Sequence, residues 1–452
     1  MKQNHKRRAV ELGKDVLILL LTCSALWLAG RTQLLGPLRN LMQEDRPQTA
    51  AGQSQGEEQI KSAVPMAMVV NIPSGEGLAQ GPELPEGGES IRLGIAHDQG
   101  ACQELFQQVA GILIETISSA GTPESITRGQ WEQALTQQLG IYMDFQGEIP
   151  MPVLVSWLSG ESTQLEGNVR RIVLAVWEDA VALYYRDETD GRYYRCRSEM
   201  ADPQTLKETL STLTDNGVFY AFESEEYEIL DPDTILFPDS PSLPVYTVSN
   251  PVSGGEDSLR SIVEDLGFNL NSTDFYPTDE WVARSGGDSV RLSDRGVVEY
   301  TAGDENSILP ILRQSDGDGA LYDSVETCRQ VAAALLGSRC GEARLYLISA
   351  VQDQSELTVE FGYSLDGIPV CLDTGYAVRF LVSDGRITQM TATLRSYASS
   401  GTYSVVMPSK QAMAAFSALD LDGQELLLTY TDNGEDTVTA GWAARRDTAG
   451  RE

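Results

Sequence analysis

The residue types that most often carry catalysis are scarce in this chain. Only two histidines occur among its 452 residues, His5 and His97. Ser-His-Asp and Cys-His catalysis both need a base of near-neutral pKa, and beyond the N-terminal segment His97 would have to supply it alone. The sequence contains no HExxH, P-loop or GxGxxG motif. A lone loop histidine is usually structural, so the sequence favours a non-enzymatic protein.

Carboxylates are the one catalytic residue type that the chain holds in excess. Its 66 Asp and Glu residues guarantee many chance pairs, and nothing distinguishes one pair as a glycosidase site. Two segments, 316–319 (DGDG) and 420–423 (DLDG), superficially resemble calcium loops. Both lack the alternating ligands and terminal Glu of an EF-hand, so tight turns are expected there. We expect neither a metal site nor a cofactor.

The six cysteines do not form a recognisable framework. Cys23 lies in an apolar N-terminal stretch, and five others are widely spaced: Cys102, Cys196, Cys328, Cys340 and Cys371. An odd number without a CxxC pair argues against both a disulfide scaffold and a zinc site. One bridge between the nearest pair, 328 and 340, remains an alternative to small buried thiols, which we favour.

A single membrane anchor is predicted near the N-terminus. Residues 16–30 (VLILLLTCSALWLAG) carry no charge, and about 1.5 Å per residue gives a helix of roughly 22 Å. The hydrocarbon core measures about 30 Å, so flanking residues would have to complete the span, and we assign the anchor to residues 16–38. A basic cluster precedes the segment, which places the N-terminus in the cytoplasm: Lys2, Lys6, Arg7 and Arg8.

Two other interpretations of this segment remain open. A cleaved secretory signal has a similar apolar length, but each candidate pair of cleavage-site positions includes a bulky residue. A lipoprotein signal at Cys23 fits poorly, because the apolar run continues beyond it. If the helix is retained, Ala25 and Ala29 form a small-xxx-small pair that would let a partner helix approach, with Trp27 beside them at the outer interface.

The net charge of −33 is unevenly distributed. The first 39 residues hold an excess of five positive charges, which leaves −38 for the rest of the chain. Such an acidic surface repels phosphate backbones and anionic headgroups, so nucleic-acid binding is excluded. The acidity otherwise indicates a soluble, monodisperse region.

We predict an α+β protein: one transmembrane helix, then a multi-domain extracytoplasmic region of helices packed on antiparallel sheets. The predicted segments are a cytoplasmic tail (1–15), the anchor (16–38), a flexible stalk (39–60), and α+β domains at 61–225, 226–312 and 313–452. The last two domains suggest a relationship, because each has a helix followed by a meander of strands. Hydrophobic periodicity and capping residues predict helices at 102–119, 131–139, 203–213, 257–266 and 323–337, and another after residue 409.

Period-two apolar patterns predict the strands. In the first domain they fall at 64–71, 171–176, 181–185 and 193–195. In the second they fall at 281–284, 289–292 and 297–300. In the third they fall at 344–351, 357–363, 368–371, 376–382 and 387–394, followed by a final hairpin that ends near Trp442.

Four stretches together resemble the YycH family of membrane-anchored regulators. The first is the basic tail and single helix, followed by a strand that contains Val64 and Pro65. The second is 141–158, a strand that runs into a Pro-bounded helix. The others are 259–300 and 357–390, and the last also resembles the companion protein YycI. The likeness lies in the pattern of hydrophobic residues and turns, and it covers most of the chain.

The resemblance implies a particular function. YycH-type proteins are not enzymes; they adjust a sensor histidine kinase that controls cell-wall metabolism in Gram-positive bacteria, through transmembrane and ectodomain contacts. They act with a second bitopic protein of the YycI type. Two other functions remain open from the sequence: an envelope-assembly or ligand-binding module without kinase contact, and a wall hydrolase.

Overall fold

The structure is a computed structural model that describes residues 62–73, 90–211, 213–252, 255–277, 280–303, 307–312, 318–419, 421 and 423–445. The predicted anchor and stalk lie outside these ranges, as do Ala25, Trp27 and Ala29. Half of each segment that resembles a calcium loop, 316–319 and 420–423, lies outside them too. Within the described ranges, no helix combines the length and apolar character needed to cross a bilayer.

The first sheet is entirely antiparallel. Its strands, in spatial order, are β2 (Ile91–Ala96), β1 (Ala67–Ile72), β4 (Gly140–Pro150), β5 (Asn168–Trp177), β6 (Ala180–Asp187), β7 (Tyr193–Arg197) and β3 (Glu124–Ile126). The central strands β4, β5 and β6 are buried along nearly their whole length. Both faces of such strands must therefore be covered by other elements.

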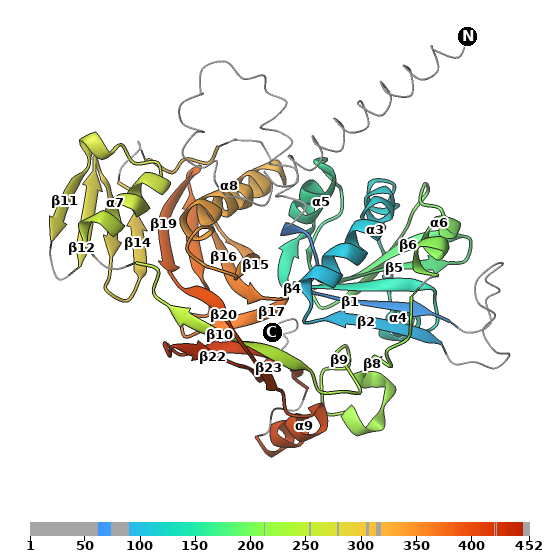
Figure 1. Cartoon of the computed structure of the whole chain (residues 1–452). Coiled ribbons are helices and arrows are strands. Elements are labelled where there is room, and N and C mark those ends of the chain that lie inside the picture. The colour runs from blue at the N-terminus through green and yellow to red at the C-terminus, as the bar shows by residue number, and fades with distance from the viewer. Residues whose placement is uncertain are drawn as a thin grey trace, which may run out of the picture. The chain divides into compact units, whose positions relative to one another are not determined.

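Helices cover the two faces of this sheet. On one face lie α3 (Gln99–Ser118), α5 (Met151–Ser159) and α6 (Pro203–Leu210), whose apolar side chains join the main core (Figure 1). On the other face, α4 (Arg128–Thr136) buries Trp131 in a second, smaller core with Tyr142 and Tyr184. The helix α4 begins with a reciprocal capping box between Thr127 and Gln130.

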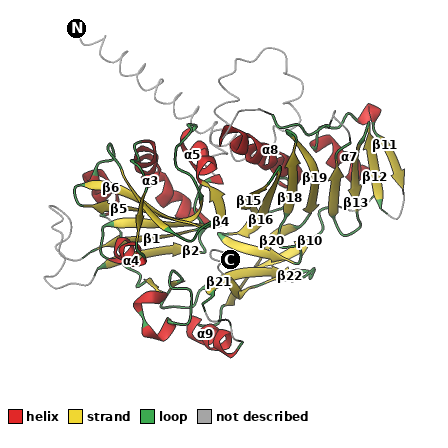
Figure 2. Ribbon diagram, turned by 180° about the vertical axis from the view of Figure 1, so that it is seen from behind, coloured by secondary structure: helices red, strands yellow, loops and turns green. Residues whose placement is uncertain are grey.

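The second sheet is larger. Its main strands, in spatial order, are β11 (Asp274–Pro277), β12 (Trp281–Ser285), β13 (Asp288–Leu292), β14 (Val297–Thr301), β19 (Arg386–Thr393), β18 (Val378–Ser383), β16 (Glu356–Leu365) and β15 (Arg344–Asp353). Because β14 pairs with β19, the two predicted meanders share one sheet. The helices α7 (Glu256–Asp265) and α8 (Asp318–Leu336) pack on it (Figure 2).

Two parallel pairings depart from the prediction of purely antiparallel sheets, one within the second sheet and one between the two sheets. The strand β17 (Ile368–Leu372) pairs antiparallel with β16 and parallel with β21 (Glu425–Asp432), which in turn pairs with β23 (Ala440–Arg445). The second parallel contact joins the two sheets, where Glu148 of β4 lies beside Ser349 of β15. Neither parallel pairing joins strands that are neighbours in the sequence, so no turn motif could predict these pairings.

The junction of the two sheets depends on an irregular stretch of β4. Its pairing with β5 shifts register between Asp144 and Ile149, and Gln146 has a positive φ of 61°. At Gly147 the backbone approaches β15 so closely that a Cβ atom would overlap the carbonyl oxygen of Leu347. Only glycine permits this approach.

Two small sheets complete the fold. The strand β10 (Ser242–Ser249) lies between β20 (Ser396–Val405) and β22 (Thr437–Val438), and β8 (Phe219–Tyr220) pairs with β9 (Ile235–Leu236). Near them lies α9 (Ser409–Ala418). Short 3₁₀ turns follow β8, at Ala221–Glu223 and Glu225–Tyr227, and a third occurs at Leu270–Ser272.

Most predicted elements are present within a few residues of their expected bounds. The predicted start of α8, at Asp323, is wrong by five residues, because the helix begins at Asp318. The predicted capping residues Asp323 and Glu326 are buried inside the helix. The Glu326 carboxylate accepts hydrogen bonds from Arg329 and from the indole of Trp157, and so cannot act as a cap. Whether 225 and 312 separate independent domains stays a prediction.

The described cysteines are free thiols. Cys328 and Cys340 do not form the bridge that the sequence left open, and both are buried. Burial raises the pKa of Cys102 and of Cys196 to about 12, so neither is a reactive thiolate at neutral pH. Four of the five described cysteines are therefore small buried thiols, as predicted, whereas Cys371 is exposed.

Replacing Gly111 with alanine should stabilise the protein. Gly111 lies in α3, and a Cβ atom at this position would meet no atom within 4 Å. Alanine is the better helix former by about 1 kcal/mol, because glycine loses more backbone entropy on folding. Urea denaturation should show a rise of that order in the free energy of unfolding, and a decrease would contradict the placement of this residue.

Candidate functional site

Two consecutive arginines interrupt the apolar sequence of β5. Arg170 and Arg171 expose only 7% and 3% of their side chains. Buried guanidinium groups are very costly unless carboxylates surround them. The fold must therefore bring acidic residues to Arg170 and Arg171.

The first carboxylate comes from the neighbouring strand. Asp144 of β4 is 1% exposed and accepts two hydrogen bonds from Arg170, at 3.0 Å from Nε and 2.8 Å from Nη2. The register shift after Asp144 turns the backbone so that the Gln146 N–H also donates to this carboxylate, at 2.7 Å. The irregular stretch that joins the two sheets thus also positions Asp144.

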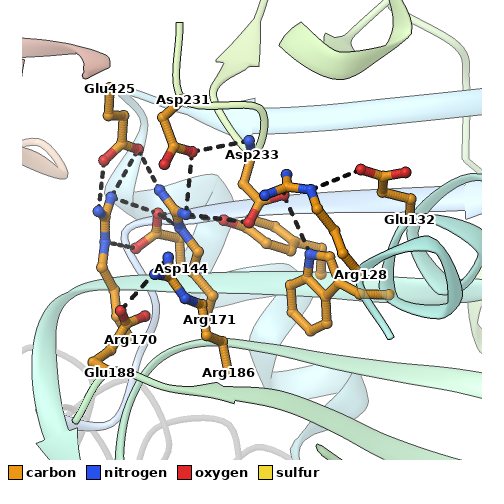
Figure 3. Close-up of polar contacts among 12 residues, drawn as sticks. Arg128, Glu132, Asp144, Arg170, Arg171, Arg186, Glu188, Asp231, Asp233 and Glu425 are labelled. Carbon is orange, nitrogen blue, oxygen red and sulfur yellow. Dashed lines mark hydrogen bonds and ion pairs between the residues drawn. The ribbon is translucent and has the colours of Figure 1, made fainter. Parts of the chain in front are cut away.

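The second carboxylate comes from near the other end of the chain. Glu425, the first residue of β21, accepts from Arg170 at 2.5 and 2.9 Å, and it pairs with Arg171 at 2.9 Å. These bonds span 255 residues of sequence. Figure 3 shows Glu425 above the two arginines and Asp144 below it.

A short loop supplies the remaining acids. The Arg171 guanidinium lies 3.5 Å from Asp231 and 3.4 Å from Asp233. Asp233 also accepts from the indole N–H of Trp131 at 3.2 Å and from Arg128 at 3.3 Å. The cluster therefore extends from β21 to α4, across the centre of the first sheet (Figure 3).

The charges of this cluster depend strongly on one another. Burial alone would raise the pKa of Glu425, but Arg170 and Arg171 outweigh burial and hold that pKa well below its usual range. For Asp233 burial dominates and raises the pKa, although Arg171 partly opposes this. Burial would also lower the pKa of Arg170, but Asp144 and Glu425 outweigh it. We infer that Arg170 and Glu425 are both ionised in the folded protein.

The composition of the cluster is that of a structural, stabilising ion network. Every arginine and carboxylate named above has a charged partner, and no nucleophile lies among them. Within the described ranges no group of His, Cys, Asp and Glu side chains could hold a metal ion. A buried network of paired charges fixes the orientation of the strands that carry it.

A cavity opens beside the cluster. Asp144 and Glu425 line a small space of about 50 Å³, together with His97, Phe237 and Trp442. The same His97, Phe237 and Trp442 also line a larger cavity of about 300 Å³ that extends towards α9. His97 has a positive φ of 64°, and desolvation lowers its pKa to about 4, so the ring is neutral at pH 7. His97, the one histidine in the described ranges, is thus a lining residue with no carboxylate partner within those ranges.

Sequence reasoning did not find this site. The predicted contact residues Ala25, Trp27 and Ala29 lie outside the described residues and are untested. The arginine pair and Asp144 were visible as charges inside apolar runs, RRIVLAV and IYMDF. Charged residues are rarely buried without partners, so these interruptions were the available signal. Glu425 gave no such signal, because it is the first residue of its strand and does not interrupt an apolar run.

Stability should fall in acid because of Glu425, although the raised pKa of Asp233 opposes this in part. The pKa of Glu425 is lowered on folding, so its stabilisation is complete above the unfolded value of about 4.3 and is lost as the pH falls below it. The lowered pKa of Asp432, held by Arg395 against burial, acts in the same direction. Urea titrations between pH 7 and pH 3 should show this decrease, and Glu425→Gln should reduce its slope. An unchanged slope in that variant would contradict the assignment.

Helices packed on large mixed sheets define this chain as an α+β protein. Its fold is that of YycH: the crystal structure of YycH from Bacillus subtilis matches with a TM-score of 0.51, covering 86% of this chain and 95% of that one. The sequence identity is 11%, so the likeness establishes the fold alone. No protein-family model matches the sequence. No curated protein matches it either. The predicted resemblance is confirmed as a likeness of fold.

Proposed function

We propose that this chain is a non-enzymatic regulator of a sensor histidine kinase that controls cell-wall metabolism in a Gram-positive-type bacterium. In this proposal it is a single-pass membrane protein with a cytoplasmic N-terminus, and a YycI-type bitopic protein is its companion. The observation that carries the proposal is the YycH fold, which extends over 86% of the chain.

Two features of the chain support this proposal. The uncharged segment 16–30 follows a basic cluster, as expected for an anchor with a cytoplasmic N-terminus. The buried charges of the cluster around Arg170 are paired with one another, which suits a rigid scaffold better than a catalyst. A helix contact of about 1–2 kcal/mol in the membrane is enough to bias a kinase poised between two conformations.

A deletion strain tests the regulatory role. Loss of the gene should change transcription of the kinase's wall-metabolism targets, and the full-length chain should restore it. A chain without residues 1–38 should not restore it, even when it is exported by another signal. Unchanged transcription in the deletion strain would contradict the proposal. Crosslinking from position 27 in intact membranes would then identify the helix that contacts the anchor.

The non-enzymatic part of the proposal has its own test. The purified full-length protein should give no clearing zone in a zymogram of cell-wall polymer. A clearing zone that disappears on a single Asp or Glu substitution would replace the regulator by a wall hydrolase.

A second candidate function is an envelope-assembly or ligand-binding module that does not contact a kinase. The cavity of about 300 Å³ lined by aromatic rings favours it, because ligand sites are usually concave and apolar. Retention of the protein on purified peptidoglycan, with no kinase recovered from the same extract, would support this candidate.

A further inference from the structure

An exposed apolar stripe lies at the end of β20. Tyr403, Val405 and Met407 expose 68%, 73% and 51% of their surfaces. Residues two apart in a strand point to the same face, so Tyr403 and Val405 form one row, and Met407 follows two residues beyond the end of β20. Adjacent exposed apolar side chains of this size often mark a binding surface.

The backbone of the same segment forms an open sheet edge. The Val406 N–H donates to the Pro241 carbonyl of the segment that leads into β10, at 3.1 Å. Successive residues of an antiparallel strand direct these groups to opposite edges, so those of Tyr403 and Val405 point away from β10. No strand pairs with that edge in the part of the chain that the structure describes.

The other end of β20 shows how such an edge is covered. The Tyr397 N–H donates to the Cys340 carbonyl, and the Glu342 N–H donates to the Tyr397 carbonyl. This cover ends near Ser399, whose N–H donates to the Glu342 side chain. The edge is therefore protected in its first half and open at Tyr403–Val405, where an added strand would find free backbone groups.

The stripe leads directly into the larger cavity. The Met407 carbonyl accepts a hydrogen bond from the Trp442 indole at 2.6 Å, and the next residue, Pro408, lines the cavity. Aromatic rings form much of the remaining wall, from Phe219, Tyr227, Phe237 and Trp442. A chain that extended the row of apolar contacts would therefore reach a space that suits an aromatic or branched side chain.

The rim of the cavity is acidic. Glu226 and Asp239 are exposed lining residues, and Lys410, the one cation among the described lining residues, pairs with Glu226 at 2.9 Å. His97 adds no charge at neutral pH. The whole chain carries −33, so a second copy would be repelled, whereas a cationic segment would be attracted.

We propose that the β20 edge and the adjoining cavity bind an extended, basic segment of a partner polypeptide. The segment adds as a strand at Tyr403–Val405, places an apolar side chain in the cavity, and brings Lys or Arg beside Glu226 and Asp239. This inference goes beyond the regulatory proposal, because it concerns how a partner is recognised and stands whether or not that partner is a kinase.

A synthetic peptide tests the binding mode on the full-length protein. The probe is the capped hexapeptide Lys-Val-Lys-Phe-Lys-Val, titrated by calorimetry, and saturable binding is expected. Val405→Pro removes a backbone N–H that points to the open edge, and it should weaken binding by about tenfold or more. Val405→Thr keeps that N–H and serves as the matched control, with affinity within about twofold of the unmodified chain. Circular dichroism establishes that both variants are folded.

The charge requirement is tested separately. A peptide with Glu in place of Lys should not bind, and the variant Glu226→Lys with Asp239→Lys should lose affinity for the basic peptide. The proposal is overturned if the basic peptide fails to bind at millimolar concentration, if Val405→Pro binds it normally, or if the acidic peptide binds equally well. A concentration-dependent dimer that Val405→Pro abolishes would instead assign the edge to a second copy of this chain.

Discussion

Replacing Arg170 with alanine should lower the free energy of unfolding by about 3–5 kcal/mol at pH 7. The substitution leaves Asp144 and Glu425 buried without their principal shared partner. Removal of one member of a buried ion network costs more than the network itself contributes, because a desolvated charge remains. Urea denaturation of the full-length protein measures the loss.

Two comparisons give this prediction its specificity. Arg197→Ala removes an ion pair with Asp179 whose side chains are 47% and 81% exposed, and it should change stability by less than about 1 kcal/mol. The loss in Arg170→Ala should also shrink as the pH falls below about 4, because protonation then neutralises the unpaired carboxylates. Equal losses in the two variants would contradict a buried network.

Replacing Gly147 with alanine should destabilise the protein by about 3 kcal/mol or more. The new methyl group would occupy the position of the Leu347 carbonyl oxygen, so β4 and β15 must move apart. The parallel contact of Glu148 with Ser349 would be lost at the same time. Amide hydrogen exchange should rise at this contact before it rises in the outer strands of either sheet.

The matched control for this prediction is Gly111→Ala, which adds the same methyl group in open space on α3. If both alanine variants were equally stable, the two sheets would not meet at Gly147 as described. If both were destabilised, the effect would not be specific to the junction.

Local signals were sufficient for most helices. The Asp202-Pro203 start of α6 was predicted from residue type, and the Asp202 carboxylate accepts from the backbone N–H groups of Gln204 and Thr205. The apolar spacing in α3 predicted its buried face, and Leu105, Phe106 and Val109 are indeed buried. Such signals are readable because each depends on residues within one or two helical turns.

The strands β10 and β20 were not predicted, for two different reasons. Proline is rare in central strands, and Pro244 lies inside β10. Among the described strands, Pro244 pairs only with β20, and the register shifts before β22 begins to pair with β10 at Tyr246. The sequence of β20, SYASSGTYSV, is mostly small and polar, and Gly401 has a φ of 73°. Tertiary pairing determined both strands, and local propensity did not.

The candidate site depends on pairings that no local pattern encodes. Asp144 and Arg170 are brought together by neighbouring strands, which the apolar periodicity suggests in outline. Glu425 reaches the same place only through the parallel pairing of β21 with β17. A single sequence gives no information on such a long-range partner, so the two arginines could be noticed but not explained.

The separation between Arg170 and Glu425 also has a consequence for biogenesis. A ribosome completes β4 and β5 well before it makes β21, so during synthesis Arg170 has Asp144 but not yet Glu425. The interior of the first sheet must stay hydrated at that point, because a dry guanidinium group with too few anions is unstable. Water can leave only when the final strands dock. A nascent chain that stalls or is cut before residue 425 would therefore retain a wet, loosened centre that proteases recognise.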